Sequence, residues 1–391
     1  MSVEPDQGWS EYKLTDLVAL PTGQVDPRKL PYREQPLLAP DHIESGTGQI
    51  IELRTSASQG ASSGKYVVRP GDVVLSKIRP ALRKVALAEF NGTCSADMYP
   101  LRSGPDVLPK FLQVELLSKR FSDFAESVSG RTGIPKINRA ELASYMVRLP
   151  AISEQRRIVK IVDAFAELER SMEREIAKLR ITRRSLIDER LAISNTHIAF
   201  SEYAVRIQSG WSPSCDQQAP GLDEWGVVRV SAVTQGVFRP EESKRLPPSL
   251  DPRENLEIIP GDLLMARANG ARDLVGVTCL VGETREKLML SDKTLRITPG
   301  PSCAGGDFLH VLLGATVVRS QIDALLSGST GQANISQMAV MSLRVPRISI
   351  SQQEDVVAIA GACNVSIRIK EEELAKIRRV KSAVTSQLLC E

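Results

Sequence analysis

A domain-sized internal repeat constrains the fold of this chain more than any other feature. Five short segments occur twice in the same order, at offsets that run from 190 (Pro70 to Pro260) to 198 (Ser129 to Ser327). The pairs are Trp9–Tyr12 with Phe200–Tyr203, Pro70–Leu75 with Pro260–Met265, Ser129–Gly133 with Ser327–Gly331, Val147–Pro150 with Leu343–Pro346, and Ile152–Gln155 with Ile350–Gln353. Stacked-repeat proteins have periods of about 20–50 residues, so this spacing excludes a solenoid. It predicts two copies of one module.

The amino-acid composition of each copy changes in its last part. The earlier part is rich in Gly, Pro, Ser and short β-branched runs, and Pro-Gly-Asp at 70–72 and 260–262 is typical of a turn that opens a strand. After Pro150 and Pro346 glycine nearly disappears. We therefore predict mixed α/β modules at residues 1–152 and 197–349, with helical segments at 153–196 and 350–391.

Both helical segments carry a narrow apolar stripe. Spacings of three and four residues, near a heptad beat, connect Ile158, Ile161, Phe165, Leu168, Met172, Ile176, Leu179 and Leu186 in the first, and Val356, Ile359, Cys363, Ile367, Leu374, Ile377, Val384 and Leu388 in the second. Ser153 and Ser351 are the predicted N-caps, and forty residues give a helix of roughly 60 Å. Dense charge elsewhere leaves neither helix stable alone, so we predict an antiparallel coiled coil. The alternative is that each stripe packs on its own module.

The composition is that of an ordinary globular protein. Of 391 residues, 42% are apolar and 25% are charged, and a formal net charge of +3 is too small to indicate nucleic-acid binding by itself. The arginine pairs 156–157 and 183–184 stand among acidic residues, which predicts a solvated helix face. The sequence start does not resemble a signal peptide, and no apolar run reaches the ~18 residues of a membrane span. We expect a cytoplasmic protein.

The sequence shows no arrangement of residues typical of catalysis or metal binding. The six cysteines form no C-x-x-C pair, and the three histidines are more than a hundred residues apart from one another. Neither a nucleophile elbow nor a complete phosphate or dinucleotide loop is present. We therefore expect no enzyme activity, no cofactor and no metal in this chain.

Two segments in each module carry side chains suited to nucleic acid. Arginine pairs bidentately with guanine and asparagine with adenine, while lysine and arginine both bind phosphate. The candidates are Lys77, Arg79, Arg83 and Lys84 in the loop after a predicted strand, Arg131, Lys136 and Asn138 in a Gly/Ser/Thr-rich segment, and Arg267, Asn269, Arg272 and Asn334 in the second copy. The alternative reading is two surface hairpins with ordinary solvated charge.

The order of these segments resembles the specificity (S) subunit of type I restriction–modification systems. The resemblance rests on Ser129–Asn138, Leu149-Pro150, Ser153–Val159 and the run Pro-Gly-Asp-Val-Val-Leu-Ser-Lys-Ile-Arg at 70–79, and it covers essentially the whole chain. The second copy departs from the pattern: Gln332-Ala333-Asn334 replaces Ile-Pro-Lys, and Ser-Gln-Gln-Glu at 351–354 replaces Ser-Glu-Gln-Arg.

The resemblance implies a DNA-reading subunit without catalysis. Each module would be a target recognition domain for one half of a bipartite, asymmetric DNA sequence. The helices would set the spacing and dock two modification (methyltransferase) subunits, which would bind S-adenosylmethionine. Restriction (endonuclease) subunits could join such a complex. Alternatives are the specificity factor of another phage-defence methylation system, or a scaffold with two protein-binding modules that does not bind DNA.

Overall fold

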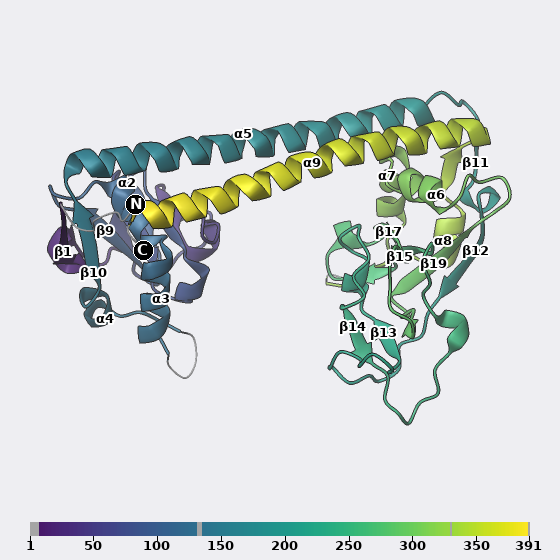
Figure 1. The fold of residues 1–391 in the computed structure, drawn as a ribbon, viewed down its shortest axis with the longest axis horizontal. Coiled ribbons are helices and arrows are strands. Elements are labelled where there is room, and N and C mark those ends of the chain that lie inside the picture. Colours follow the sequence, from purple (N-terminus) through teal and green to yellow (C-terminus); the bar gives the residue numbers. More distant parts are fainter. Residues whose placement is uncertain (1–7, 131–134, 329–330, 390–391) are drawn as a thin grey trace, which may run out of the picture. The chain divides into compact units, whose positions relative to one another are not determined.

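The computed structural model describes residues 8–130, 135–328 and 331–389. These residues form two compact units, which contain the elements labelled in Figure 1. Unit 1 extends to Glu173 and resumes at Glu372, and unit 2 runs from Arg174 to Glu371. The division passes through two long helices, so each unit contains one module and a part of both helices.

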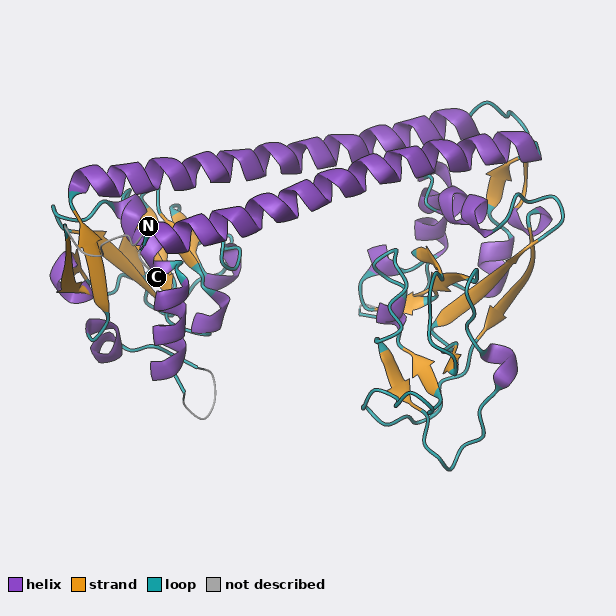
Figure 2. Ribbon diagram, in the orientation of Figure 1, coloured by secondary structure: helices purple, strands orange, loops and turns teal. Residues whose placement is uncertain are grey.

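Small sheets and short helices build the module of unit 1 (Figure 2). An antiparallel sheet has the order β2-β9-β6-β7, a second sheet has the order β4-β3-β8-β5, and β1 pairs with β10. The strands are β1 (Trp9–Lys13), β2 (Val18–Ala19), β3 (Pro36–Leu38), β4 (Arg54–Thr55), β5 (Tyr66–Val68), β6 (Asp72–Ser76), β7 (Val85–Leu87), β8 (Gly92–Cys94), β9 (Met98–Ser103) and β10 (Met146–Pro150). The helices are α1 (Leu14–Leu17), α2 (Pro109–Leu116), α3 (Lys119–Val128) and α4 (Arg139–Ala143), with 3-10 turns η1 (Pro40–His42) and η2 (Pro80–Leu82).

The module of unit 2 repeats this architecture. Its antiparallel sheet has the order β12-β19-β15-β17, and its second sheet, β14-β13-β18, keeps the parallel pair found between β3 and β8. The strands are β11 (His197–Ala199), β12 (Ala204–Ser209), β13 (Gly226–Val228), β14 (Ser243–Arg245), β15 (Leu263–Ala266), β16 (Ala268–Asn269), β17 (Thr278–Leu280), β18 (Leu288–Met289), β19 (Thr294–Pro299), β20 (Ala333–Asn334) and β21 (Arg344–Pro346). The helices are α6 (Gly306–Leu313), α7 (Thr316–Leu325) and α8 (Gln337–Met341), with 3-10 turns η3 (Phe200–Glu202), η4 (Val230–Ala232), η5 (Glu254–Leu256) and η6 (Arg272–Leu274).

The central strand of each antiparallel sheet is buried on both faces. In β6, Val73 and Leu75 face the core under the helices, and Val74 faces the core under the second sheet. In β15, Leu263 likewise lies in one core and Leu264 in the other. Because side chains alternate along a strand, a continuous apolar run is needed where both faces are covered. The short run after each Pro-Gly-Asp meets this requirement.

Each Pro-Gly-Asp turn is closed by an ion pair across the sheet. The Asp72 carboxylate is 1% exposed and accepts two hydrogen bonds of 2.9 Å from the Arg102 guanidinium. In unit 2, Asp262 and Arg296 form the equivalent pair at 2.8 Å. Burial raises the pKa of Asp262, and the hydrogen bond from the backbone of Ile259 and the charge of Arg296 oppose that rise. The aspartate therefore fixes the turn to the neighbouring strand.

The two predicted helices are α5 (Ile152–Leu191) and α9 (Ile350–Leu388), and they run antiparallel within each unit (Figure 1). In unit 1 the ion pairs Glu169–Lys381 and Glu173–Arg378 show this direction, because the α9 number falls as the α5 number rises. In unit 2 the ion pairs Glu175–Lys370 and Arg180–Glu371 connect the two helices. The helices also pack on the modules, because Ile158 of α5 lies in the core of unit 1 and Leu191 in that of unit 2. Pairing and packing on modules thus both occur.

The predicted N-caps lie two residues too late in the sequence. Both helices begin two residues earlier than a cap at Ser153 or Ser351 requires, so these serines lie in the first turn. In α9 the cap is Ser349, whose Oγ accepts from the Gln352 backbone N–H at 3.3 Å while the Gln352 side chain accepts from the Ser349 N–H at 2.9 Å. This is a reciprocal capping box.

One sequence match does not align equivalent residues. Trp9–Tyr12 lies in strand β1, whereas Phe200–Glu202 is the 3-10 turn η3. The backbone N–H of Phe200 donates to the carbonyl of Leu343, and Leu14 makes the equivalent bond to Tyr145. Phe200 therefore corresponds to Leu14, and the match to Trp9 arises from composition.

A buried glutamine fastens each module to the start of its helix. Gln155 is fully buried; its Oε1 accepts from the Leu108 N–H, and its Nε2 donates to the carbonyls of Asp106 and Pro150, all at 2.9 Å. Gln353 is also fully buried and makes the same three bonds, to Ala304, Ser302 and Ile348, at 2.7–3.1 Å. The Ile-Ser-x-Gln repeat is therefore structural: we call each of these glutamines a glutamine latch.

Among the described residues, no single helix is long and apolar enough to cross a membrane. Helices α6 and α7 meet that test only when they are taken together as a bent pair.

We predict that Gln155→Ala lowers the free energy of unfolding by about 3 kcal/mol. The change removes three hydrogen bonds, at about 1 kcal/mol each. Urea denaturation measures the loss, and Gln353→Ala should have a similar effect. Gln387→Ala, at an exposed position of α9, is the control and should change the value by less than about 0.5 kcal/mol. Equal effects of the buried and exposed changes would contradict the latch.

Candidate functional site

The two predicted binding segments of unit 1 lie side by side. Ile78, in the loop after β6, forms a β-bridge with Lys136. The Arg79 N–H donates to the carbonyl of Pro135, and the Ile137 N–H donates to that of Lys77, both at 2.9 Å. The loop at 77–84 and the segment at 135–138 therefore form one surface, which we call the loop pair of unit 1.

The same pairing recurs in unit 2. Strand β16 pairs with β20, so that Ala268 lies opposite Asn334, and the Ile335 N–H donates to the Arg267 carbonyl at 2.9 Å. We call this surface the loop pair of unit 2. Its register makes Arg267 equivalent to Lys77, Asn269 to Arg79, and Asn334 to Lys136. Segments more than 50 residues apart in sequence thus meet in both modules.

Two arginines of the unit 1 loop pair have an unusual backbone conformation. Arg79 and Arg83 flank η2 and have φ of 49° and 45°. Lys287 is the other residue besides glycine with positive φ in the described chain. Such a conformation costs a residue with a Cβ roughly 1–2 kcal/mol, and strain of this kind concentrates at functional sites.

The unit 1 candidates differ in how far their charges are engaged. Lys77 donates to the Ala96 carbonyl and lies 4.3 Å from the centre of the Tyr99 ring. Lys84 donates to the carbonyl of Pro40 at 2.7 Å, and Lys136 lies 3.7 Å from Asp97. In contrast, the exposed side chains of Arg79 and Arg83 have no hydrogen-bond or ion-pair partner in the described part of the chain. These two arginines are the charges most available to an anionic ligand.

Asn138 has a structural role. It is the N-cap of α4: its Oδ1 accepts from the Glu141 N–H at 2.9 Å, and the Glu141 carboxylate accepts from the Asn138 N–H at 2.7 Å. Sequence reasoning missed this capping box, although Asn-x-x-Glu is its usual pattern. The predicted site residue Arg131 lies outside the described residues.

The unit 2 candidates are polar more than basic. Asn269 accepts from the Ala271 N–H at 3.0 Å, and Asn334 accepts from the Ser327 hydroxyl at 3.0 Å. Both amides keep their NH₂ donors and a second oxygen lone pair, which is what recognition of an adenine edge requires. Arg267 contacts Ser209 at 3.3 Å, and Arg272 is exposed with a long 3.5 Å contact to the Asp323 carbonyl.

Two further cations lie beside the loop pairs and were absent from the sequence candidates. In unit 1, the exposed Arg139 follows Asn138 directly, and its guanidinium lies 5.7 Å from the centre of the Tyr99 ring. In unit 2, the Arg267 N–H donates to the carbonyl of the exposed Lys293. In unit 1, the Lys77 N–H donates to the carbonyl of Asp97, so Lys293 corresponds to Asp97. Aligning 96–98 with 292–294 would have revealed this exchange of an acid for a base.

Comparison with known proteins finds a family model that matches the first module and part of the following helix. Residues 6–180 match the model of the type I restriction modification DNA specificity domain. Over 139 residues, 36% of this chain, it is 40% identical to the EcoDI specificity subunit of a type I restriction enzyme from Escherichia coli, covering 31% of that protein. It is 38% identical over 138 residues, 35% of the chain, to the EcoEI subunit from the same organism, covering 23% of it. The chain thus spans less than a third of these curated relatives.

The likeness in fold extends over the whole chain. A solved structure from work on complex assembly and conformational transition of the type I R-M system matches 99% of both chains, with a TM-score of 0.62 and 21% sequence identity. The predicted fold class, two duplicated α/β modules each followed by a long helix, is confirmed.

We predict that Arg83→Gly raises the free energy of unfolding by about 1 kcal/mol, because glycine adopts positive φ without a clash of Cβ. Arg83→Ala is the matched control: it removes the same side chain but keeps Cβ, so it should give no such gain. Urea denaturation of both variants compares them directly. Equal stability of the two would show that the turn stores no strain.

Proposed function

We propose that this chain is a specificity subunit of a type I restriction–modification system and that it reads DNA for a methyltransferase complex; the family-model match over residues 6–180 and the two curated relatives support this proposal. Each module contacts one half of a bipartite, asymmetric target through its loop pair. The observation that carries this proposal is that both modules bring the same two segments together by equivalent backbone hydrogen bonds. A duplicated site with different side chains suits a target whose two halves differ in sequence.

The two loop pairs would use different chemistry. Arg79 and Arg83 are exposed and lack partners among the described residues, so they are suited to phosphate contacts or to the guanine edge. Asn269 and Asn334 present amides that are suited to adenine. The engaged cations Lys77 and Lys84 would contribute by holding the loop conformation, as would the cap residue Asn138.

The helices would dock the modification subunits and set the distance between the half-sites. Several large apolar side chains on them remain more than a third exposed: Leu168, Ile181 and Leu186 on α5, and Val365, Ile369 and Val380 on α9. Apolar side chains left in water along a helix pair are typical of a surface that binds a partner. Two modification subunits would bind there and supply S-adenosylmethionine and the methyl transfer. This chain would contribute no catalytic residue, cofactor or metal, and restriction subunits could join.

We predict that the double variant Arg79→Gln, Arg83→Gln weakens binding to all DNA sequences and lowers the salt dependence. Each lost phosphate contact removes about 0.9 from the slope of log K against log salt, so two contacts remove about two. Fluorescence anisotropy of the complete complex at several salt concentrations measures the slope.

The control for this experiment is Arg28→Gln. Arg28 is an exposed arginine of the same unit, but it pairs with Asp26 through two bonds of 2.9 Å. Its loss should leave the slope unchanged. An unchanged slope in the double variant as well would mean that the unit 1 loop pair does not contact the DNA backbone.

We predict that deleting the gene abolishes a gapped, asymmetric methyladenine motif in host DNA. Single-molecule methylation sequencing with and without the gene reveals both half-sites. Restoring the gene with Asn269→Ala should relax one position of one half-site, since an amide–adenine contact provides about 1–3 kcal/mol of discrimination. An unchanged methylome beside an expressed, active methyltransferase would contradict the proposed function and favour the scaffold alternative.

A further inference from the structure

Unit 2 contains a cavity of about 690 Å³ whose lining includes four arginines. Arg180, Arg183 and Arg184 reach it from α5, and Arg319 reaches it from α7. Asp273 is the acidic residue among the described residues that line it. The lining therefore has more basic than acidic side chains, although two of the arginines form ion pairs with carboxylates outside it.

Arg183 is the unusual member of this group. Its Nε is buried and has no hydrogen-bond partner among the described residues, and burial lowers the pKa of its guanidinium. Arg184, in turn, has no ion pair there. Arg180 pairs with Glu371 at 2.6 Å, and Arg319 with Asp323 at 2.7 Å. Arg183 is half-buried, and taking an unpaired charge even partly out of water is costly, so an anion bound beside it would stabilise the folded protein. The sequence prediction of a solvated face is wrong for this residue.

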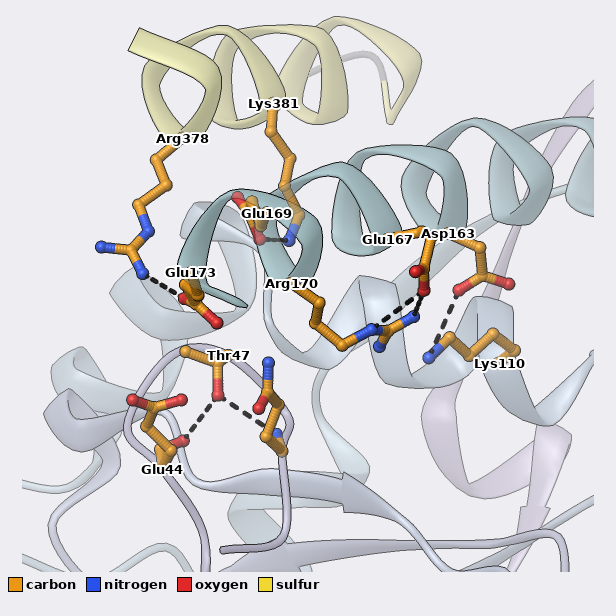
Figure 3. Close-up of polar contacts among 11 residues, drawn as sticks. Glu44, Thr47, Lys110, Asp163, Glu167, Glu169, Arg170, Glu173, Arg378 and Lys381 are labelled. Atoms are coloured by element: carbon orange, nitrogen blue, oxygen red, sulfur yellow. Dashed lines mark hydrogen bonds and ion pairs between the residues drawn. The ribbon is translucent and has the colours of Figure 1, made fainter. Parts of the chain in front are cut away.

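The equivalent corner of unit 1 has its charges paired. A groove of about 400 Å³ lies there between the loop at 44–49, the α2–α3 corner and the helix pair. Figure 3 shows Lys381 directed to Glu169 and Arg378 directed to Glu173, at 2.8 and 2.6 Å. The same view shows Lys110 facing Asp163 at 3.5 Å.

The repeat identifies what differs between the two corners. The long helices begin at Ile152 and Ile350, an offset of 198 (350 − 152). This offset relates Arg378–Glu173 to Arg180–Glu371, and both pairs are formed. It also relates Lys381 to Arg183 and Glu169 to Ile367. In unit 2 the carboxylate that neutralises the cation has therefore been replaced by an apolar side chain, which is buried.

Neutral hydrogen-bonding groups complete the lining. The Thr278 hydroxyl lies 2.9 Å from Nδ1 of His310. Burial, and then the charge of Arg183, lower the pKa of His310, so the ring is neutral near pH 7. Asn364 adds an amide, and the described lining residues include no Phe, Tyr or Trp on which a nucleobase could stack. The donors therefore suit an oxyanion without a base.

We propose that this cavity is a phosphate-binding site that takes a multiply charged phosphate oxyanion. Guanidinium forks match phosphate oxygens bidentately, and several forks that converge on one cavity match a ligand with more than one negative charge better than they match a single carboxylate. The phosphate is either a free species such as pyrophosphate or a pair of adjacent backbone phosphates of bound nucleic acid, each of which carries one negative charge. The proposal does not depend on the function assigned to the loop pairs.

The experiment is isothermal titration of the full chain with sodium pyrophosphate in the absence of DNA. We expect Arg183→Gln to weaken binding at least tenfold. Ile367→Glu restores the carboxylate that unit 1 has in Glu169 and should weaken binding at least as much. Ile367→Gln is the matched control, since it has the same size and polarity without the charge and should retain binding. Arg190→Gln removes an exposed arginine of α5 outside the cavity and should also retain binding.

A second titration with duplex DNA distinguishes the two sources of phosphate. If pyrophosphate competes with DNA and Ile367→Glu weakens both, the site takes a backbone phosphate. If Ile367→Glu loses pyrophosphate alone, the ligand is a free phosphate compound. The proposal is overturned if the unmodified protein does not bind pyrophosphate, or if Ile367→Glu binds it as well as Ile367→Gln does. If the unmodified protein does not bind pyrophosphate, and the variants lose binding of a methyltransferase subunit, the arginines bind carboxylates of that partner instead.

Discussion

The glutamine latch is the interaction on which the arrangement of each unit depends. A helix of forty residues with a narrow apolar stripe needs a fixed starting direction, since an error at its first turn grows along its length. Gln155 sets that direction through three hydrogen bonds to the strand before the helix and to the segment that enters α2. Gln353 does the same with equivalent partners. Any other side chain at this fully buried position is costly, because it loses these three hydrogen bonds.

The antiparallel sheet of each module fixes the position of its loop pair. The ion pairs Asp72–Arg102 and Asp262–Arg296 fasten the turn at the start of the central strand to the neighbouring strand. The central strand then leads directly into the loop. The loop is then held at its far side by backbone bonds to Pro135 in unit 1. Variation among exposed side chains such as Arg79 can therefore proceed without loss of the fold, because none of these fastening contacts uses them.

The sequence could predict those parts of the structure that depend on periodicity and duplication. The long helices, their antiparallel pairing and the equivalence of the two loop pairs follow from spacings that are visible along the chain. The sequence could not predict which cations are engaged: Lys84 finds a carbonyl 44 residues away, and Asn138 is used as a cap. It also could not show that Arg183 is half-buried, because the charge pattern along α5 does not say which residue of α9 lies opposite.

The duplication permits an argument that a single module would not. Where both copies keep a contact, as in the two glutamine latches, folding requires it, and its chemistry reports on stability. Where equivalent contacts are lost, as with Ile367 in place of Glu169, the fold tolerates the loss, and the change needs another cause. An unpaired arginine in a cavity raises the energy of the folded state, so its persistence opposite an apolar residue points to an anion that arrives from outside the chain.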